Sequence, residues 1–421
     1  MNAKTAETVS AAAVTIDDIR RAASVIAGHV LRTPAVRAPR LSEATGAAEV
    51  VLKLENQQYT GSFKDRGAYN KLASLDAQAK TAGVIAMSAG NHAQGVAYHA
   101  QRLGIPATIV MPEGTPFNKV ERTASFGARV LIHGDSIDAA AVFARDMAAR
   151  EGLTFVHPYD DPLIVAGQGT IGLELLADFP DLDTIVVPIG GGGVMSGVAT
   201  AAKSINPKID MIGVEAALYP SMHNAVRGLP PHNGGQTIAE GIAVKSPGKL
   251  TQAIISRLVG DLLLVNEDAL ERAVQMMAER QKVIAEGAGA AGLAAMIAHP
   301  ARFKGRKVGL VVCGGNIDSR MLAQVLMRGL VREGRVVTLR IGISDTPGVL
   351  GKLAQLVGSS GGNIIEIHHQ RMFHDLPVKR ADVDAVIETR NPEHYREIID
   401  SLEKEGFPTR LLSNLSVGDS I

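Results

Sequence analysis

The chain has 421 residues, of which 46% are hydrophobic and 20% are charged, and its 43 basic side chains balance 43 acidic ones. This length predicts about two or three domains, and the zero net charge argues against nucleic-acid or membrane-surface binding through bulk charge. The single cysteine, Cys313, excludes an intramolecular disulfide and a cysteine metal cluster. We therefore expect a protein of the reducing cytoplasm whose partner is a small molecule.

Two stretches are candidates for export or membrane signals. Residues 1–19 lack a basic start followed by an apolar run, so we expect a flexible lead-in or the start of a helix. Residues 184–202 carry no charge over nearly the length of a membrane span. They also contain Pro188 and four consecutive glycines, which favours a strand, a loop and a helix over a membrane helix.

Between residues 20 and 325, short apolar runs alternate with longer helical stretches. Most of the runs are β-branched and do not alternate with polar residues, as in strands buried on both faces of a parallel sheet. This pattern predicts an α/β fold built from connected βα units. The predicted strands are residues 49–54, 83–87, 107–111, 129–132, 184–188, 211–214 and 307–312, and two of the helices are 92–103 and 194–204.

The sequence SFKDRGA places Lys64 between Phe63 and an Asp-Arg pair, where a loop becomes a helix. A lysine at a helix start beside Arg66 lies in a positive field, which lowers the pKa of its amine. Such an amine forms a Schiff base with a carbonyl cofactor. The alternative is an ordinary solvated lysine, and only further parts of the same site argue against it.

The sequence SAGNHAQG, which begins at Ser88, again runs from a strand into a helix. Ser88 and Asn91 can cap that helix, and its free N–H groups could hold a carboxylate. A plain capping loop is the alternative. By itself, His92 suits packing or capping better than general-base catalysis.

Four consecutive glycines follow the predicted strand at 184–188 and precede a helix of small residues. Glycines allow close backbone approach, and the N–H groups of a helix start collect around an anion, so we expect a phosphate there. A flexible turn is one alternative. A dinucleotide site is another, because Glu215 follows about twenty residues later, where a ribose-binding acid would lie. Against it, Met195 or Ser196 occupies the third glycine position of that fingerprint.

A fourth segment, CGGN, begins at Cys313 after another apolar strand. No charged neighbour in the sequence indicates a lowered pKa for this thiol. We therefore interpret Cys313 as a small buried side chain and not as a nucleophile.

The pattern changes after residue 325. Residues 326–335 are short and basic and indicate a linker, and residues 336–421 form a separate domain with the order β-α-β-β-α-β of a ferredoxin-like fold. Its predicted elements are a strand at 336–343, a turn at 344–348, a helix at 349–357, strands at 363–370 and 382–389, a helix at 392–404 and a strand at 409–412.

Together, SFKDRGA, SAGNHAQG, GGGGV and CGGN resemble the threonine dehydratase (threonine ammonia-lyase) family of pyridoxal-phosphate enzymes, in order and spacing, over roughly residues 20–325. The resemblance implies a catalytic unit of the tryptophan-synthase β-like fold (fold type II), with two subdomains, the smaller at about 55–155. The tail, with VVTLRIGISDTPGVLGKLAQLV and GGNIIEI, resembles an ACT domain, a small-molecule regulatory module.

The resemblance also implies residue roles. Lys64 would bind pyridoxal 5′-phosphate as a Schiff base and abstract the substrate α-proton, while Asn91 would hydrogen-bond the ring 3′-hydroxyl. A neutral Cys313 thiol facing the pyridine nitrogen would make the ring a weaker electron sink and favour loss of the β-hydroxyl over transamination. The cofactor would be held by Lys64, Phe63, Asn91, Cys313 and the phosphate loop of Gly190, Gly191, Gly192, Gly193 and Val194. The substrate carboxylate would be held by Ser88, Ala89, Gly90, Asn91 and His92.

The activity that the resemblance implies is dehydration and deamination of L-threonine, and of L-serine more slowly, to 2-oxobutyrate or pyruvate and ammonia. An amino-acid effector would bind the ACT domain near Asp345, Gly348 and Asn363, in a homo-oligomer such as a tetramer. Relatives of the serine racemase type have a further acid where this chain has Ser221, after Glu215, so we expect no metal site.

Several alternatives stay open. Within the same cofactor class, the substrate could be 3-hydroxyaspartate, or the reaction could be serine racemisation. In other classes, the protein could be a nicotinamide-dependent oxidoreductase or a catalytically silent amino-acid sensor.

Overall fold

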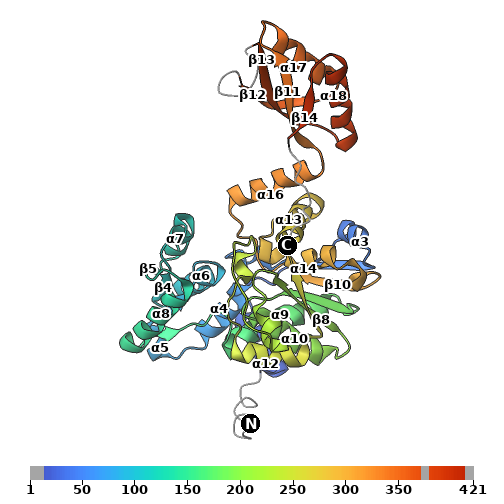
Figure 1. Cartoon of the computed structure of the whole chain (residues 1–421). Coiled ribbons are helices and arrows are strands. Elements are labelled where there is room, and N and C mark those ends of the chain that lie inside the picture. Colours follow the sequence, from blue (N-terminus) through green and yellow to red (C-terminus); the bar gives the residue numbers. More distant parts are fainter. Residues whose placement is uncertain (1–13, 371–378, 413–421) are drawn as a thin grey trace. The chain divides into compact units, whose positions relative to one another are not determined.

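The computed structural model describes residues 14–370 and 379–412 (Figure 1). The chain divides into two compact units, Met1–Ile317 and Asp318–Ile421. The first unit contains a six-stranded and a four-stranded sheet, and the second contains another four-stranded sheet. Within the described ranges, no helix is both long and apolar enough to cross a membrane.

The six-stranded sheet forms the centre of the first unit. Only its edge strand β1 runs antiparallel to its neighbour, and the other pairs are parallel. Strand β7 is buried along its whole length, which accounts for its unbroken apolar sequence. In spatial order the strands are β1 (Ala35–Arg37), β2 (Glu49–Lys53), β10 (Lys307–Val311), β7 (Thr184–Pro188), β8 (Asp210–Ala216) and β9 (Asp261–Val265).

Helices pack around this sheet. Figure 1 shows α9, α10 and α12 grouped together, and α14 packs on β7, β8 and β9. The helices of this part are α2 (Ile16–Ile26), α3 (Pro39–Thr45), α9 (Pro162–Asp178), α10 (Gly193–Ile205), α11 (Ser221–Arg227), α12 (Lys249–Leu258), α13 (Glu267–Met276), α14 (Gly287–Ala298) and α15 (Pro300–Phe303). Three short turns complete it: the 3₁₀ helices η1 (Glu55–Gln57) and η2 (Glu240–Ile242) and the π-helix η3 (Met277–Gln281).

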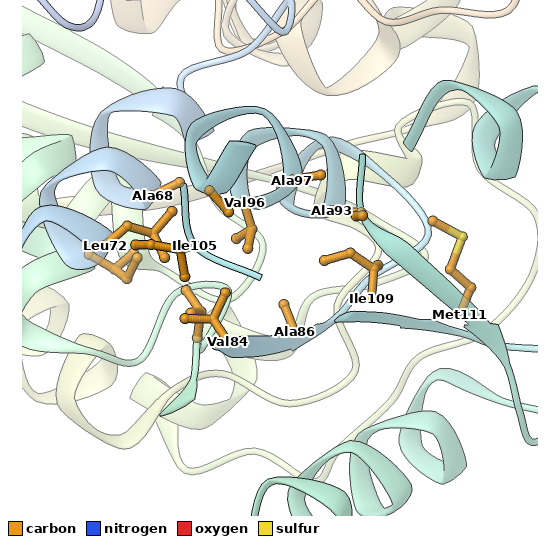
Figure 2. Close-up of a cluster of buried hydrophobic side chains, with 14 residues drawn as sticks. Ala68, Leu72, Val84, Ala86, Ala93, Val96, Ala97, Ile105, Ile109 and Met111 are labelled. Carbon is orange, nitrogen blue, oxygen red and sulfur yellow. The ribbon is translucent and has the colours of Figure 1, made fainter. Parts of the chain in front are cut away.

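The four-stranded sheet of the first unit is parallel throughout and has the order β5-β4-β3-β6. The core between this sheet and helices α4 and α6 includes Leu72, Val96 and Ile109 (Figure 2). This packing sets the positions of the first turns of α4 and α6. The elements are α4 (Lys64–Ala73), α5 (Ala77–Ala82), β3 (Val84–Met87), α6 (Asn91–Leu103), β4 (Ala107–Met111), α7 (Phe117–Ala124), β5 (Arg129–Ile132), α8 (Ile137–Glu151) and β6 (Thr154–Phe155).

The second unit has an antiparallel sheet of order β12-β13-β11-β14, packed on α17 and α18 over a core that includes Leu339, Leu353 and Ile398. Alternate residues of β11 are buried, as expected for a sheet with one covered face. The elements are α16 (Ser319–Arg332), β11 (Val336–Ser344), α17 (Val349–Ser359), β12 (Asn363–Gln370), β13 (Arg380–Glu388), α18 (Pro392–Lys404) and β14 (Thr409–Leu411).

Two boundaries differ from the sequence prediction. Helix α2 begins at Ile16, inside the predicted lead-in, because Thr15 and Asp18 form a reciprocal capping box. Helix α16 occupies residues predicted as linker, and the units divide before Asp318, whose side chain caps that helix. The lead-in residues 1–13 lie outside the described residues.

Candidate active site

Lys64 begins α4, and its amine lies in a densely packed part of the first unit. Its Nζ donates to the carbonyl of Pro158 at 2.6 Å and lies 5.1 Å from the centre of the Phe63 ring. The side chain keeps some exposed surface, yet burial lowers the pKa of the Lys64 amine to about 8. A substantial fraction of this amine is therefore neutral near physiological pH, as a nucleophile or base requires.

Arg66 is not the cause of the lowered pKa of Lys64, and the sequence-based prediction on this point is wrong. The Arg66 guanidinium is fully buried and donates to Glu55 at 2.7 and 2.8 Å and to Glu174 at 2.7 and 2.8 Å. These two carboxylates balance the positive charge of the Arg66 guanidinium, which stays protonated. Desolvation of the Lys64 amine is the cause that remains.

The glycine run joins β7 to α10 through a tight loop. A Cβ on Gly191 would overlap the Tyr159 ring, and Gly192 has a φ of +93°, a conformation that favours glycine. The carbonyl of Gly191 accepts from Thr251 Oγ1 at 2.6 Å. The first N–H groups of α10 have no acceptor within the helix, so the loop presents donors to an anion.

The loop after β3 carries Ser88 to His92 into α6. The predicted side-chain cap is wrong: Gly90 occupies the cap position and no side chain caps the helix. Ser88 Oγ instead accepts from Gly90 N at 3.1 Å, and the Asn91 amide is held by Glu286 and Asn316, each at 2.7 Å. The first turn of α6 therefore keeps its N–H groups available for a carboxylate.

His92 is a packed histidine, as the sequence indicated. Its Nε2 lies 2.9 Å from the carbonyl of Val156, and the side chain is buried. Burial, together with the charge of Lys64, lowers the pKa of His92 to about 3. This imidazole therefore stays neutral in the folded protein.

Cys313 follows β10 and is buried. Burial, reinforced by the charge of Glu286, raises the pKa of its thiol well above the ordinary value. The thiol is therefore neutral. The carbonyl of Cys313 accepts from Phe63 N at 3.0 Å, which places the CGGN segment against the start of α4.

Short hydrogen bonds join the four segments. Asn316 Nδ2 donates to the carbonyl of Thr60 and to Asn91 Oδ1, both at 2.7 Å, so it links three of them. The fourth, the glycine loop, meets Lys64 through residues 158 and 159, because Pro158 accepts from the amine and Tyr159 packs on Gly191. The structure thus brings together the segments that the sequence analysis singled out.

Sequence reasoning missed four contributors: Tyr159, Glu286 and the two carboxylates that pair with Arg66, Glu55 and Glu174. Glu286 is the one among them with a usable sequence signal, since it is the acid directly before the uncharged helix GAGAAGLAAMIA. The other contributors have no local motif.

Glu215, weighed as a ribose ligand or a metal ligand, has another role. It is fully buried at the end of β8 and accepts from the N–H groups of Met222 at 2.8 Å and His223 at 2.7 Å, so it caps α11. Burial raises the pKa of Glu215 to about 7, although these hydrogen bonds oppose the shift. Among residues 14–370 and 379–412, no group of three or more His, Cys, Asp or Glu side chains is placed to hold a metal ion.

The site fits pyridoxal phosphate. The glycine loop ends at the first turn of α10, and the free N–H groups there suit a phosphate. Lys64 offers an amine with a lowered pKa to an aldehyde, and Cys313 offers a neutral thiol. The hydroxyl of Ser62, two residues before Lys64, is buried without a hydrogen-bond partner among the described residues, so it is free to bond to a polar group of a cofactor.

Comparison with known proteins agrees with this geometry. An L-threonine ammonia-lyase of Thermotoga maritima is 43% identical over 401 residues, covering 95% of this chain and 100% of that protein. Another from Geobacter sulfurreducens is 42% identical over 381 residues, covering 90% of this chain and 94% of that protein.

Two solved structures are similar to the chain at the level of the fold and of the sequence. A tomato (Solanum lycopersicum) threonine deaminase, isoform 2 in its processed form, has a TM-score of 0.70 at 33% identity, covering 76% of this chain and 88% of its own. Maize serine racemase has a TM-score of 0.70 at 36% identity, covering 76% of this chain and 98% of its own. The model of the family described as pyridoxal-phosphate dependent enzyme matches residues 26–314. The chain therefore belongs to the family of pyridoxal-phosphate dependent enzymes, with the α/β architecture of its fold-type-II members.

Proposed function

We propose that the protein is a lyase that converts L-threonine to 2-oxobutyrate and ammonia, and L-serine more slowly to pyruvate and ammonia. The observation that carries this proposal is the Lys64 amine, whose pKa is lowered to about 8 beside a neutral Cys313 thiol. The choice of threonine is supported by the 43% identity to a threonine ammonia-lyase along 95% of the chain.

Each residue of the site would have a separate task. When bound, pyridoxal phosphate supplies an electron sink for the pair released at the substrate α-carbon. Gly190 to Val194 would hold its phosphate, with Phe63 and Asn91 holding the ring. Ser88 to His92 would bind the substrate carboxylate at the start of α6.

Lys64 would act as the base of the reaction. Once freed by the substrate, its neutral amine can take the proton from the substrate α-carbon. Cys313 would face the ring nitrogen without transferring a proton to it, because burial keeps the thiol neutral. That arrangement favours departure of the β-hydroxyl over transamination.

We further propose that the second unit is an ACT domain of ferredoxin-like fold that binds an amino-acid effector near Asp345 and Gly348. Its order β11-α17-β12-β13-α18-β14 supports this assignment. Gly348 has a φ of +88° with open space beside it, so the turn leaves room for a ligand.

Asn363, also predicted to contact the effector, lies far from the turn of Asp345 and Gly348 within one copy of the unit. Asp345 N bonds to Lys379, just before β13, whereas Asn363 pairs with Glu388 at the end of β13. These ends are about 25 Å apart at the usual rise of a strand. We also propose that the protein is a homo-oligomer, such as a tetramer. In that assembly, Asn363 would contact only an effector that is bound to another copy of the chain.

The decisive experiment incubates the cofactor-loaded protein with L-threonine and measures 2-oxobutyrate, with and without isoleucine. Parallel reactions with L-serine and 3-hydroxyaspartate rank the substrates, and chiral analysis of serine detects racemisation. Racemisation without release of a 2-oxo acid would overturn the proposal. The similarity to maize serine racemase makes that control necessary.

A further inference from the structure

Glu286 occupies the position before α14 but does not cap that helix. An acid at this position commonly accepts from the free N–H groups of the first turn. Here the Glu286 side chain turns away, and its Oε1 accepts from Asn91 Nδ2 at 2.7 Å. The carboxyl therefore serves the active site and not its own helix.

The surrounding backbone is shaped to admit this carboxyl. A Cβ on Gly314 would overlap Glu286 Oε1, and one on Gly241 would lie 3.3 Å from it. The chain reaches Glu286 through the π-helix η3, and Lys282 then takes a φ of +58°, the one described non-glycine residue with positive φ. Irregularities of both kinds concentrate at functional sites.

The hydrogen bonds have one consistent direction. Thr60 O accepts from Asn316 Nδ2, which also donates to Asn91 Oδ1, and Asn91 Nδ2 donates to Glu286. Each amide can therefore adopt only one orientation. The Asn91 Nδ2 atom keeps a second hydrogen for another acceptor.

Glu286 is the titratable group at the end of this chain of hydrogen bonds. Burial raises the pKa of Glu286 to about 7, while the Asn91 hydrogen bond opposes the shift. The charged or titratable groups that face it are Glu240 on η2, Lys119 on α7 and the Cys313 thiol. Glu240 raises the pKa and Lys119 lowers it.

We propose that Glu286 is a positioning residue that fixes the orientation of Asn91, and that exchange of one proton between its carboxyl and solvent changes the strength of this hold. The ionised carboxylate accepts the Asn91 N–H strongly and directs the second N–H toward the cofactor. The protonated carboxyl is a weaker acceptor and loosens the amide. This inference rests on the proposed cofactor site and assigns a residue that controls it.

The test titrates the absorbance of bound pyridoxal phosphate between pH 5.5 and 9 in the wild type, in Glu286→Gln and in Glu215→Gln. Glutamine keeps an acceptor but cannot titrate. We expect a spectral transition within about one unit of pH 7 in the wild type. Glu286→Gln should lose it, and Glu215→Gln should keep it, because Glu215 is an equally shifted carboxyl that bonds to backbone. A transition that survives in Glu286→Gln would overturn the inference.

A second measurement tests whether Glu286 acts through Asn91. The cofactor dissociation constant is measured for Glu286→Ala, Asn91→Ala and the double variant. We expect about a tenfold loss for Glu286→Ala and no further loss when it is added to Asn91→Ala. Additive losses would contradict the inference. If Glu286→Ala does not fold, the spectra of Glu286→Gln decide alone.

These outcomes separate the inference from the proposed function. If the wild type binds the cofactor and forms 2-oxobutyrate while Glu286→Gln behaves normally, only the role of Glu286 is wrong. If the wild type forms no 2-oxobutyrate but its spectrum titrates through Glu286, the proposed substrate is wrong and the role of Glu286 stands.

Discussion

Lys64 and Arg66 lie on the first turn of α4 in opposite electrostatic surroundings. Arg66 is fully buried between the carboxylates of Glu55 and Glu174. Burial lowers the pKa of Arg66, but these two acids outweigh burial and raise it overall. Lys64 donates to a backbone carbonyl, and burial lowers its pKa to about 8.

The difference shows how one helix turn can hold a permanent charge and a neutral amine together. Carboxylates that pair with a buried cation keep it charged. The dipole of one backbone carbonyl, such as the one that accepts from Lys64, does not offset the desolvation of the cation. Lys53 also donates to Glu174, at 2.5 Å, so the Arg66 network ties α4 to β2 and α9. The ion pairs of Arg66 thus hold the start of α4 in place. Lys64, which donates to a backbone carbonyl, stays reactive.

Removing the reactive member of this pair should have the largest effect. We expect Lys64→Ala to lower the rate of threonine dehydration by at least about 10⁴-fold, since both cofactor attachment and proton transfer need the amine. Initial rates of 2-oxobutyrate formation measure this loss. Lys71→Ala, a change on the same helix at a residue that pairs with Asp161, should keep nearly full activity. A Lys64→Ala enzyme with wild-type rates would show that another group is the base.

Removing the paired member should act on stability. Arg66→Met leaves the fully buried Glu55 without its nearest cation and leaves Glu174 with Lys53 alone, so we expect a loss of about 3–5 kcal/mol in the free energy of unfolding. Urea denaturation of the cofactor-free protein measures it. As the matched control, Arg37→Ala breaks an exposed pair with Glu49 and should cost at most about 1 kcal/mol. Equal losses in the two variants would contradict the special role of the buried network.

The surroundings of Lys64 can be altered without touching the lysine. A Cβ at Gly191 would overlap the ring of Tyr159, the residue after the one that accepts from Lys64. We expect Gly191→Ala to destabilise the protein by about 1–3 kcal/mol and to weaken cofactor binding. Gly351→Ala, in open space on α17, should instead be neutral or slightly stabilising. Thermal melts and equilibrium dialysis check both variants, and unchanged cofactor affinity in Gly191→Ala would count against the phosphate loop.

Much of this arrangement follows from local sequence. Strand β7, the glycine loop and α10 were predictable, because a β-branched run, glycines and small residues each have a strong local preference. The same holds for the segments after β3 and β10. Short edge strands were not predictable, since β1 and β6 have only three and two residues.

The electrostatics of the site were not predictable from neighbours in the chain. Glu174 lies 108 residues from Arg66 and Glu286 lies 195 residues from Asn91, so only the folded structure brings each pair together. The sequence therefore indicated that Lys64 is reactive but attributed the shift to Arg66. The residues that cancel the charge of Arg66 are distant, and the desolvation that acts on Lys64 depends on packing.

The pH dependence of cofactor uptake tests the Lys64 side of the comparison directly. The neutral amine attacks the aldehyde, and with a pKa of about 8 its fraction rises about tenfold between pH 7 and 9. Stopped-flow absorbance of the cofactor-free protein mixed with pyridoxal phosphate should show this rise. Stability should also rise with pH over part of this range. The unfolded state binds the lysine proton more tightly than the folded state does. The contribution of Lys64 to the free energy of unfolding therefore increases as pH rises from about 8 toward 10.5. Lys64→Met should remove this slope, while Arg66, charged throughout, adds none. An uptake rate that rises about a hundredfold between pH 7 and 9 would mean that Lys64 has the pKa of a solvated lysine. A rate that stays flat would mean that the amine is already neutral at pH 7, and either result would contradict a pKa of about 8.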